Sequence, residues 1–219
     1  MILTYKDFKL DFYDKKIICI ALFASVWIIS NILATKICQI GFFTIETGCI
    51  LFPVTYVLGD VITEVFGEKV MMKTVLLSLL ANLIMMIAGV IAVGLPYPPS
   101  FTAQEHFAYM FTFVPRIVLG SFIGCYCGQY VNARIMTIMK EKTNGKYLFA
   151  RTIGSTIGGE FVDSLLFIGI GFLGTMPIEI LIGFILTQYI MKVLIEVCLQ
   201  PLTYTAIHAI EEKPKISDN

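Results

Sequence analysis

Six long runs of apolar residues make up most of this chain, and short polar segments separate them. A bilayer core about 30 Å thick needs about 20 apolar residues in a helix, and each run comes close to that length or exceeds it. The pattern therefore predicts an all-α, polytopic membrane protein with six transmembrane helices in one domain, 17–208, between an N-terminal segment, 1–16, and a tail, 209–219. The six runs are 17–38, 49–66, 70–95, 111–133, 152–174 and 178–208.

Composition supports the same class of protein. Of the 219 residues, 57% are hydrophobic and 15% are charged, and the mean hydropathy is +0.82. Soluble domains have about 45–50% apolar and about 25% charged residues. The net charge of zero gives no basic surface for nucleic acid. The six cysteines lack the CxxC and Cys/His spacings of zinc sites, so we expect small buried thiols and neither a metal nor a cofactor.

Lysine and arginine are distributed unevenly between the segments outside the runs. Alternate segments hold 13 of them, and the segments on the other side hold one, Lys36. Basic residues stay on the cytoplasmic side of a membrane protein. The sequence therefore predicts a multi-pass protein of the cytoplasmic (inner) membrane with both termini in the cytoplasm.

Charged residues inside the predicted spans are the main candidates for function. A charge at the bilayer centre costs a few kcal/mol, so such residues usually face a protein-lined cavity and mark a substrate path. Five acids outnumber two bases, which fits a proton-coupled or cation-binding site. The acids are Asp60, Glu64, Glu160, Asp163 and Glu196, and the bases are Arg116 and Lys192.

The roles of two of these residues stay open at this point. Asp60 and Glu64 share one helix face, one turn apart, but Glu64 also fits the cytoplasmic interface beside Glu68. Lys192 is four residues before Glu196 and suits a pair within its own helix. The alternative is that the Lys192 ammonium neutralises an acid on another span, such as Asp60 or Asp163. A third stripe, Gly120, Gly124 and Gly128, predicts close helix packing.

Two short segments are similar to each other. GDVITE at 59–64 and GEFVDS at 159–164 each lie in the middle run of three. An inverted repeat of three plus three helices would place a substrate site near the midplane, where the halves meet. Chance similarity between two polar patches is the alternative.

Five motifs in order resemble the queuosine-precursor transporter family. They are SNILATK (30–36), GDVITEVFG (59–67), PR followed by GS (115–116 and 120–121), STIGGEFVDSLLF (155–167) and QYIMKVLIEVCLQP (188–201). The resemblance implies import of 7-deazaguanine bases such as preQ0, preQ1 or queuine, used to salvage a tRNA modification. Its polar positions match Asn31, Asp60, Arg116, Ser121, Ser155, Thr156, Asp163 and Lys192. Glu160 stands where the family pattern has a neutral amide.

The sequence thus predicts a secondary importer whose substrate-binding residues also include Glu64, Glu160 and Gln188. A guanine-like base offers a ring N–H and an exocyclic amine to one carboxylate, either Asp60 or Asp163. Asn31 or Gln188 would meet its other polar edges. The expected partners are this heterocyclic base and the lipid bilayer, and a homodimer is compatible with so small a bundle.

Two other classes of protein were weighed against the importer. A substrate-capture subunit of an energy-coupling factor complex, which needs an ATPase partner, has a similar size and helix count. Ala21 and Ala24 in the first run are its only support. An intramembrane enzyme is not expected, because the chain has only two histidines, outside or near the ends of the runs, and no HExxH motif.

Overall fold

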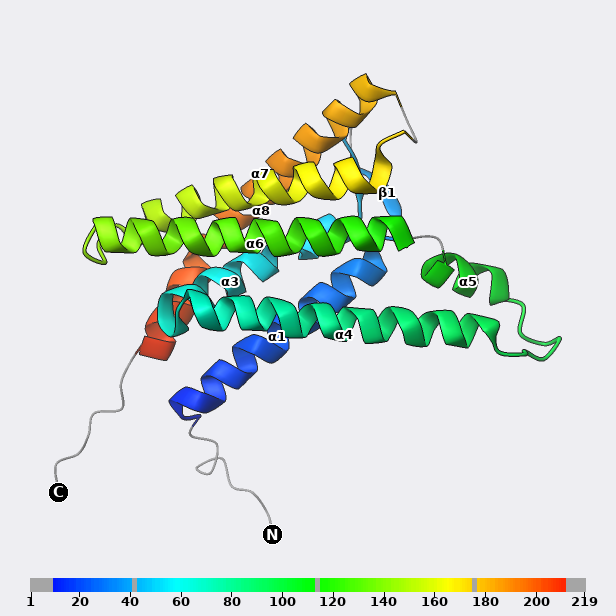
Figure 1. Cartoon of the computed structure of the whole chain (residues 1–219), viewed down its shortest axis with the longest axis horizontal. Coiled ribbons are helices and arrows are strands. Elements are labelled where there is room, and N and C mark those ends of the chain that lie inside the picture. Colours follow the sequence, from blue (N-terminus) through cyan, green and yellow to red (C-terminus); the bar gives the residue numbers. More distant parts are fainter. Residues whose placement is uncertain (1–9, 41–42, 113–114, 175–176, 212–219) are drawn as a thin grey trace, which may run out of the picture.

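The fold is a bundle of long helices with one short β-hairpin (Figure 1). A computed structural model describes residues 10–40, 43–112, 115–174 and 177–211. The elements in chain order are α1 (Phe12–Leu33), β1 (Ile37–Ile40), β2 (Phe43–Glu46), α2 (Gly48–Leu51), α3 (Pro53–Phe66), α4 (Glu68–Gly94), α5 (Gln104–Thr112), α6 (Pro115–Lys142), α7 (Leu148–Phe172) and α8 (Ile178–Glu211).

Among the described residues, five segments are long and apolar enough to cross a membrane, which confirms the all-α, polytopic prediction. The fourth predicted span falls in α6, whose 28 residues suffice in length. Its described part is more polar than the other spans, because it carries Gln129 and Asn132 before the basic residues at its end. Six spans in total therefore stay a prediction.

The first predicted span, 17–38, is wrong at both ends. α1 begins at Phe12, where Asp11 and Asp14 form a capping box, and it ends at Leu33. The chain then turns into the antiparallel pair β1–β2, in which Ile37 lies opposite Glu46. Apolar residues continue through this hairpin, so hydropathy alone did not separate it from the helix.

Two further boundaries differ from the sequence prediction. The segment after α4 contains α5, a nine-residue helix that was not expected. α6 runs to Lys142, well beyond the predicted end at residue 133, because the basic segment continues the helix. At the turn between α3 and α4, by contrast, Gly67 with φ 92° allows the sharp reversal that the sequence placed at 67–69.

Glycines bring α6 and α7 into close contact along their length. A Cβ added at Gly120 would lie 2.9 Å from the Phe167 carbonyl oxygen, and one at Gly124 would lie 2.9 Å from that of Asp163. A Cβ at Gly128 would lie 2.9 Å from the Gly159 carbonyl oxygen. Real Cβ atoms are not found so close, and small residues allow the backbones to approach. The predicted packing role of this stripe is confirmed.

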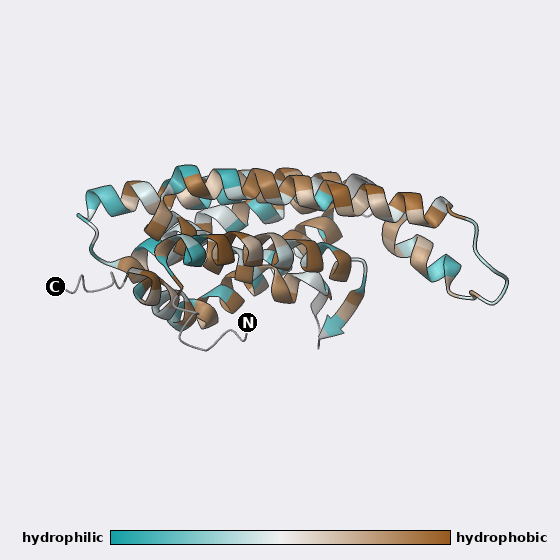
Figure 2. Ribbon diagram, turned by 90° about the horizontal axis from the view of Figure 1, so that it is seen from below, coloured by the Kyte–Doolittle hydropathy of each residue, from teal (hydrophilic) through white to brown (hydrophobic). Residues whose placement is uncertain are grey.

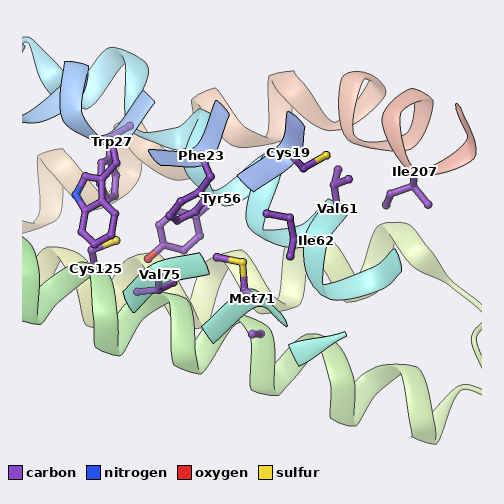
Figure 3. Close-up of a cluster of buried hydrophobic side chains, with 12 residues drawn as sticks. Cys19, Phe23, Trp27, Tyr56, Val61, Ile62, Met71, Val75, Cys125 and Ile207 are labelled. Atoms are coloured by element: carbon purple, nitrogen blue, oxygen red, sulfur yellow. The ribbon is translucent and has the colours of Figure 1, made fainter. Parts of the chain in front are cut away.

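The apolar core lies where α1, α3, α4, α6 and α8 meet (Figure 3). Phe23 and Trp27 of α1 pack edge to face, with ring centroids 5.9 Å apart, and both are fully buried. Tyr56 and Ile62 from α3 and Cys125 from α6 belong to the same cluster. This core holds α3, which is short for a span, inside the bundle.

Hydrophobic residues predominate along most of the length of the long helices (Figure 2). Large aliphatic side chains such as Leu80 and Ile84 of α4 and Leu186 and Ile190 of α8 are about half exposed. A contiguous apolar surface of this kind is what lipid requires.

The start of α1, the end of α8 and the turn between α6 and α7 lie at one end of the bundle, to the left in Figure 1. The Lys15 ammonium of α1 donates to the Ala209 carbonyl oxygen of α8. Arg134, Lys140 and Arg151 pair with acids at the same end. The basic residues from separate parts of the sequence are therefore collected at this end, which we term the basic end.

Candidate functional site

A continuous series of buried polar side chains runs between α3, α6, α7 and α8. In each of them, 7% or less of the residue's surface is exposed. We term this series the polar tract: Glu46, Asp60, Asn132, Thr152, Ser155, Thr156, Glu160, Asp163, Gln188, Lys192, Glu196 and Gln200. On α8 it extends from Gln188 to Gln200, which is about 18 Å along a helix and more than half of a bilayer core.

Lys192 of α8 lies at the centre of one cluster in the tract. Its ammonium donates to Asp163 on α7 and lies 3.4 Å from a carboxylate oxygen of Glu160. The Phe52 ring is on another side, with its centroid 4.4 Å from the ammonium. Of the two alternatives for Lys192, the structure supports pairing with Asp163 on another helix; no ion pair with Glu196 is found among the described residues.

Glu46 joins this cluster from the hairpin and was not identified from the sequence. The Gln188 amide donates to one Glu46 oxygen at 3.0 Å, and the Cys49 backbone N–H donates to the other at 2.7 Å. Burial raises the pKa of Glu46 to about 7, although the positive charge of Lys192 acts in the opposite direction. A signal was present: Glu46 is the only charged residue between Lys36 and Asp60.

Asp60 of α3 lies in a second cluster with α6 and α7. The Asn132 side chain of α6 donates to one Asp60 oxygen at 2.8 Å, and Ser155 of α7 lies close to the same carboxylate. The sequence prediction omitted Asn132, because an Asn near the end of a span has no distinctive pattern. Asp60 is fully buried and belongs to a different cluster from Lys192.

The two clusters are joined through polar pairs between α7 and α8. The Thr156 hydroxyl donates to Glu196, and the Thr152 hydroxyl donates to Gln200 at 2.8 Å. On α8, Glu196 is one turn from Lys192 and Gln200 is one turn further. Predicted residues Ser155, Thr156, Glu160, Asp163, Gln188 and Lys192 thus lie in one tract with Asp60.

Many polar atoms in and beside the tract are buried without a hydrogen-bond partner among the described residues. Such atoms cost about 1–3 kcal/mol each, and folded proteins leave few of them. Their concentration here makes the tract the candidate functional site. They include Tyr56 Oη, Asp60 Oδ2, both amide atoms of Gln129, Asn132 Oδ1, both Glu160 oxygens, Gln188 Oε1 and Glu196 Oε2.

Asn31 and Ser121 form a separate small network. The Asn31 amide donates to Asn82 of α4 at 2.7 Å, and Ser121 of α6 donates to Asn31 at 2.9 Å. Asn82 in turn donates to the Ser78 carbonyl oxygen at 2.9 Å. Each of these side chains has a partner within the bundle, and none of them contacts the tract through a hydrogen bond described here.

Glu64 lies at the basic end, one helical turn from Asp60 on α3. Arg151 forms a two-pronged ion pair with its carboxylate, and Lys140 lies 3.0 Å from one of its oxygens. Arg134 and Glu68 form a further pair at 3.5 Å. Of the two interpretations of Glu64, this geometry favours the interface. The predicted residue Arg116 belongs to the first turn of α6, and its side chain lies outside the described part of the chain.

Comparison with known proteins assigns the chain to a family. A family model described as "Putative vitamin uptake transporter" matches residues 46–206. The chain belongs to this family. The matched segment begins at Glu46 and contains the whole polar tract, whereas Asn31 precedes it. Membership confirms the predicted class, a multi-pass membrane transporter.

One curated relative is similar over most of both chains. It is a protein of Bacillus subtilis (strain 168) named "Probable queuosine precursor transporter", 24% identical over 182 residues, which cover 81% of this chain and 78% of the relative. The family resemblance found in the sequence is thereby confirmed. No solved structure matches the chain. In the described part of the chain, no group of three or more His, Cys, Asp or Glu side chains is arranged to hold a metal ion.

Proposed function

We propose that this transporter is a secondary importer of queuosine precursors, 7-deazaguanine bases, that works by alternating access. The observation that carries the proposal is the state of Asp60. This carboxylate is fully buried and accepts from Asn132 through one oxygen, while its other oxygen has no hydrogen-bond partner among the described residues. The relative named for queuosine precursors supports the substrate class.

The groups around Asp60 suit a guanine-like edge. A ring N–H and the adjacent exocyclic amine donate in parallel to one carboxylate, which gives two charge-assisted hydrogen bonds. Each carboxylate oxygen accepts two hydrogen bonds, so Oδ1 binds a base donor without losing Asn132. In the alternative site, Asp163, the carboxylate is already paired with Lys192. We therefore assign the base to Asp60.

Gln129 supplies the complementary groups. A Cβ added at Gly59, the residue before Asp60, would lie 2.6 Å from Gln129 Oε1, so this side chain reaches the α3 face beside the carboxylate. Both polar atoms of the Gln129 amide are buried and have no hydrogen-bond partner in the part of the chain that the structure describes. An amide donates to a ring carbonyl oxygen and accepts from a ring N–H, as a 7-deazaguanine requires.

The basic end is assigned to the cytoplasm, with both chain termini. The collection of Lys and Arg at one end supports this orientation. In this arrangement the Glu64–Arg151–Lys140 pairs cover the cytoplasmic end of the tract, and opening toward the cytoplasm requires that they separate.

The experiment is uptake of a labelled 7-deazaguanine base into proteoliposomes that contain the purified chain alone. Asp60→Asn removes the carboxylate charge and is expected to lower uptake at least about tenfold, since hydrogen bonds to a charged group contribute about 1.5–3 kcal/mol each. The matched control is Glu141→Gln, at an exposed position near the end of α6, which should transport as the original chain does.

Two results would overturn the proposal. One is unchanged uptake by Asp60→Asn at a rate equal to the control. The other is a requirement for ATPase subunits before any uptake is seen, because a secondary importer needs none.

A further inference from the structure

The cluster at Lys192 contains more negative than positive charge. One ammonium lies between the carboxylates of Asp163 and Glu160, and Glu46 approaches from β2 through Gln188. All four charged side chains are buried. If every carboxylate were ionised, the cluster would hold a net charge of −2, which is costly away from water.

Glu160 is the carboxylate that the protein leaves least satisfied. Lys192 donates its hydrogen bond to Asp163, and Glu46 accepts from Gln188 and from the Cys49 backbone. Neither oxygen of Glu160 accepts a hydrogen bond from the described residues, although its side chain is completely buried. A buried charge without such bonds is unfavourable, so Glu160 needs a further positive charge.

Two neutral groups without partners lie beside the same cluster. Gln188 Oε1 and Tyr56 Oη are both buried with no hydrogen-bond partner among the described residues. A Cβ added at Gly128 would meet both the Tyr56 hydroxyl and, at 2.8 Å, the Asp163 Cβ, so the hydroxyl lies next to Asp163. These two oxygen atoms come from α8 and α3 and add neutral hydrogen-bonding groups to the cluster.

We propose that Glu160 binds one proton that is transported together with the base and so couples import to the proton gradient. The inference rests on the proposed function and adds its driving force. When the tract opens outward, the Glu160 carboxylate binds a proton and becomes a neutral carboxylic acid. When the tract opens to the cytoplasm, the acid releases this proton and becomes a carboxylate again. The ion pair between Lys192 and Asp163 is kept throughout.

A proton suits this place better than a metal cation. The Lys192 ammonium lies 3.4 Å from Glu160 and would repel a second cation at that distance, whereas a proton removes the charge of Glu160 without occupying space. Other titratable groups face Glu160 from each neighbouring element. They are Asp163 on α7, Lys192, Glu196 and Tyr189 on α8, Glu46 on β2, Cys49 on α2, Tyr56 on α3 and Cys125 on α6.

The test uses proteoliposomes with the purified chain and the labelled nitrile-substituted 7-deazaguanine, which is uncharged. Potassium and valinomycin hold the membrane potential at zero. Exchange of labelled for unlabelled base reports binding and alternation. Accumulation of base inside the liposomes, driven by an outside-acidic pH gradient, reports coupling. With one coupled proton, one pH unit supports about tenfold accumulation of a neutral base.

Glu160→Gln should exchange base but accumulate none in response to the pH gradient, while Glu141→Gln should do both. A dye trapped inside should report acidification when base enters liposomes with the original chain. The proposal is overturned if entering base moves no protons, if a sodium gradient at equal pH drives accumulation instead, or if Glu160→Gln still accumulates tenfold per pH unit.

The two proposals fail in distinguishable ways. Absence of exchange by the original chain refutes the queuosine-precursor function itself. If the original chain exchanges base but the pH gradient drives no accumulation, only the proton coupling is refuted. If Glu160→Gln does not fold, the dye measurement on the original chain still decides the question.

Discussion

Replacing Lys192 with methionine tests whether the buried ion pair between α7 and α8 is the one that the structure shows. Methionine keeps most of the apolar stem but removes the ammonium from Asp163, Glu160 and the Phe52 ring. Loss of one partner of a buried pair costs about 3–5 kcal/mol, because the other charge remains buried. The lost contact with the Phe52 ring adds up to about 2 kcal/mol.

The pairwise part of this cost can be isolated with a double-mutant cycle. Asp163→Asn removes the charge left behind, so Lys192→Met combined with Asp163→Asn should be less destabilised than the sum of the single variants by about 3 kcal/mol. Glu196→Gln is the matched comparison. It lies one turn away on α8 but makes its hydrogen bond with Thr156, so it should be additive with Lys192→Met within about 0.5 kcal/mol.

Reversible unfolding in mixed detergent micelles at neutral pH gives the free energies of unfolding for the cycle. A coupling energy for Lys192 and Asp163 below about 0.5 kcal/mol would refute the assigned pair. A larger coupling between Lys192 and Glu196 would show that the ammonium is paired within its own helix.

Two further predictions concern helix packing and pH. Gly128→Ala should destabilise the protein by about 1–3 kcal/mol in the same unfolding assay, because its Cβ would meet the Gly159 carbonyl oxygen at 2.9 Å. Gly169→Ala, with open space at its Cβ, should be neutral or stabilising by up to about 1 kcal/mol. Equal effects of the two substitutions would contradict the close approach of α6 and α7. The pKa of Glu46 is raised from 4.5 to about 7 in the folded protein, so the folded state binds a proton there that the unfolded chain has lost. The contribution of Glu46 to the free energy of unfolding is therefore largest below pH 4.5 and falls by about 3 kcal/mol as the pH rises to 7. Glu46→Gln should flatten this part of the stability profile, and a variant with an unchanged slope would show that another group is responsible.

Hydropathy and charge in the sequence determined the class of protein and most of its helices. Lipid provides no hydrogen-bonding partner for the backbone, so long apolar runs must be helical. Acidic residues inside such runs must be buried in protein and not face lipid. Asp60, Glu160 and Asp163 are buried in this way. Small residues at four-residue spacing predicted the α6–α7 contact for a similarly local reason.

Only the tertiary structure decided which buried groups meet. The sequence offered Lys192 three acidic partners, Glu196 on its own helix and Asp60 or Asp163 on other spans. The packing of α8 against α7 selects Asp163. Glu46 reaches the same cluster because a hairpin folds back to α8, and Asn132 reaches Asp60 because α6 crosses α3. Glu64, one turn from Asp60 on α3, pairs with Arg151, 87 residues further along the chain. Contacts of this range depend on how whole helices pack, and no periodicity within one segment contains that information.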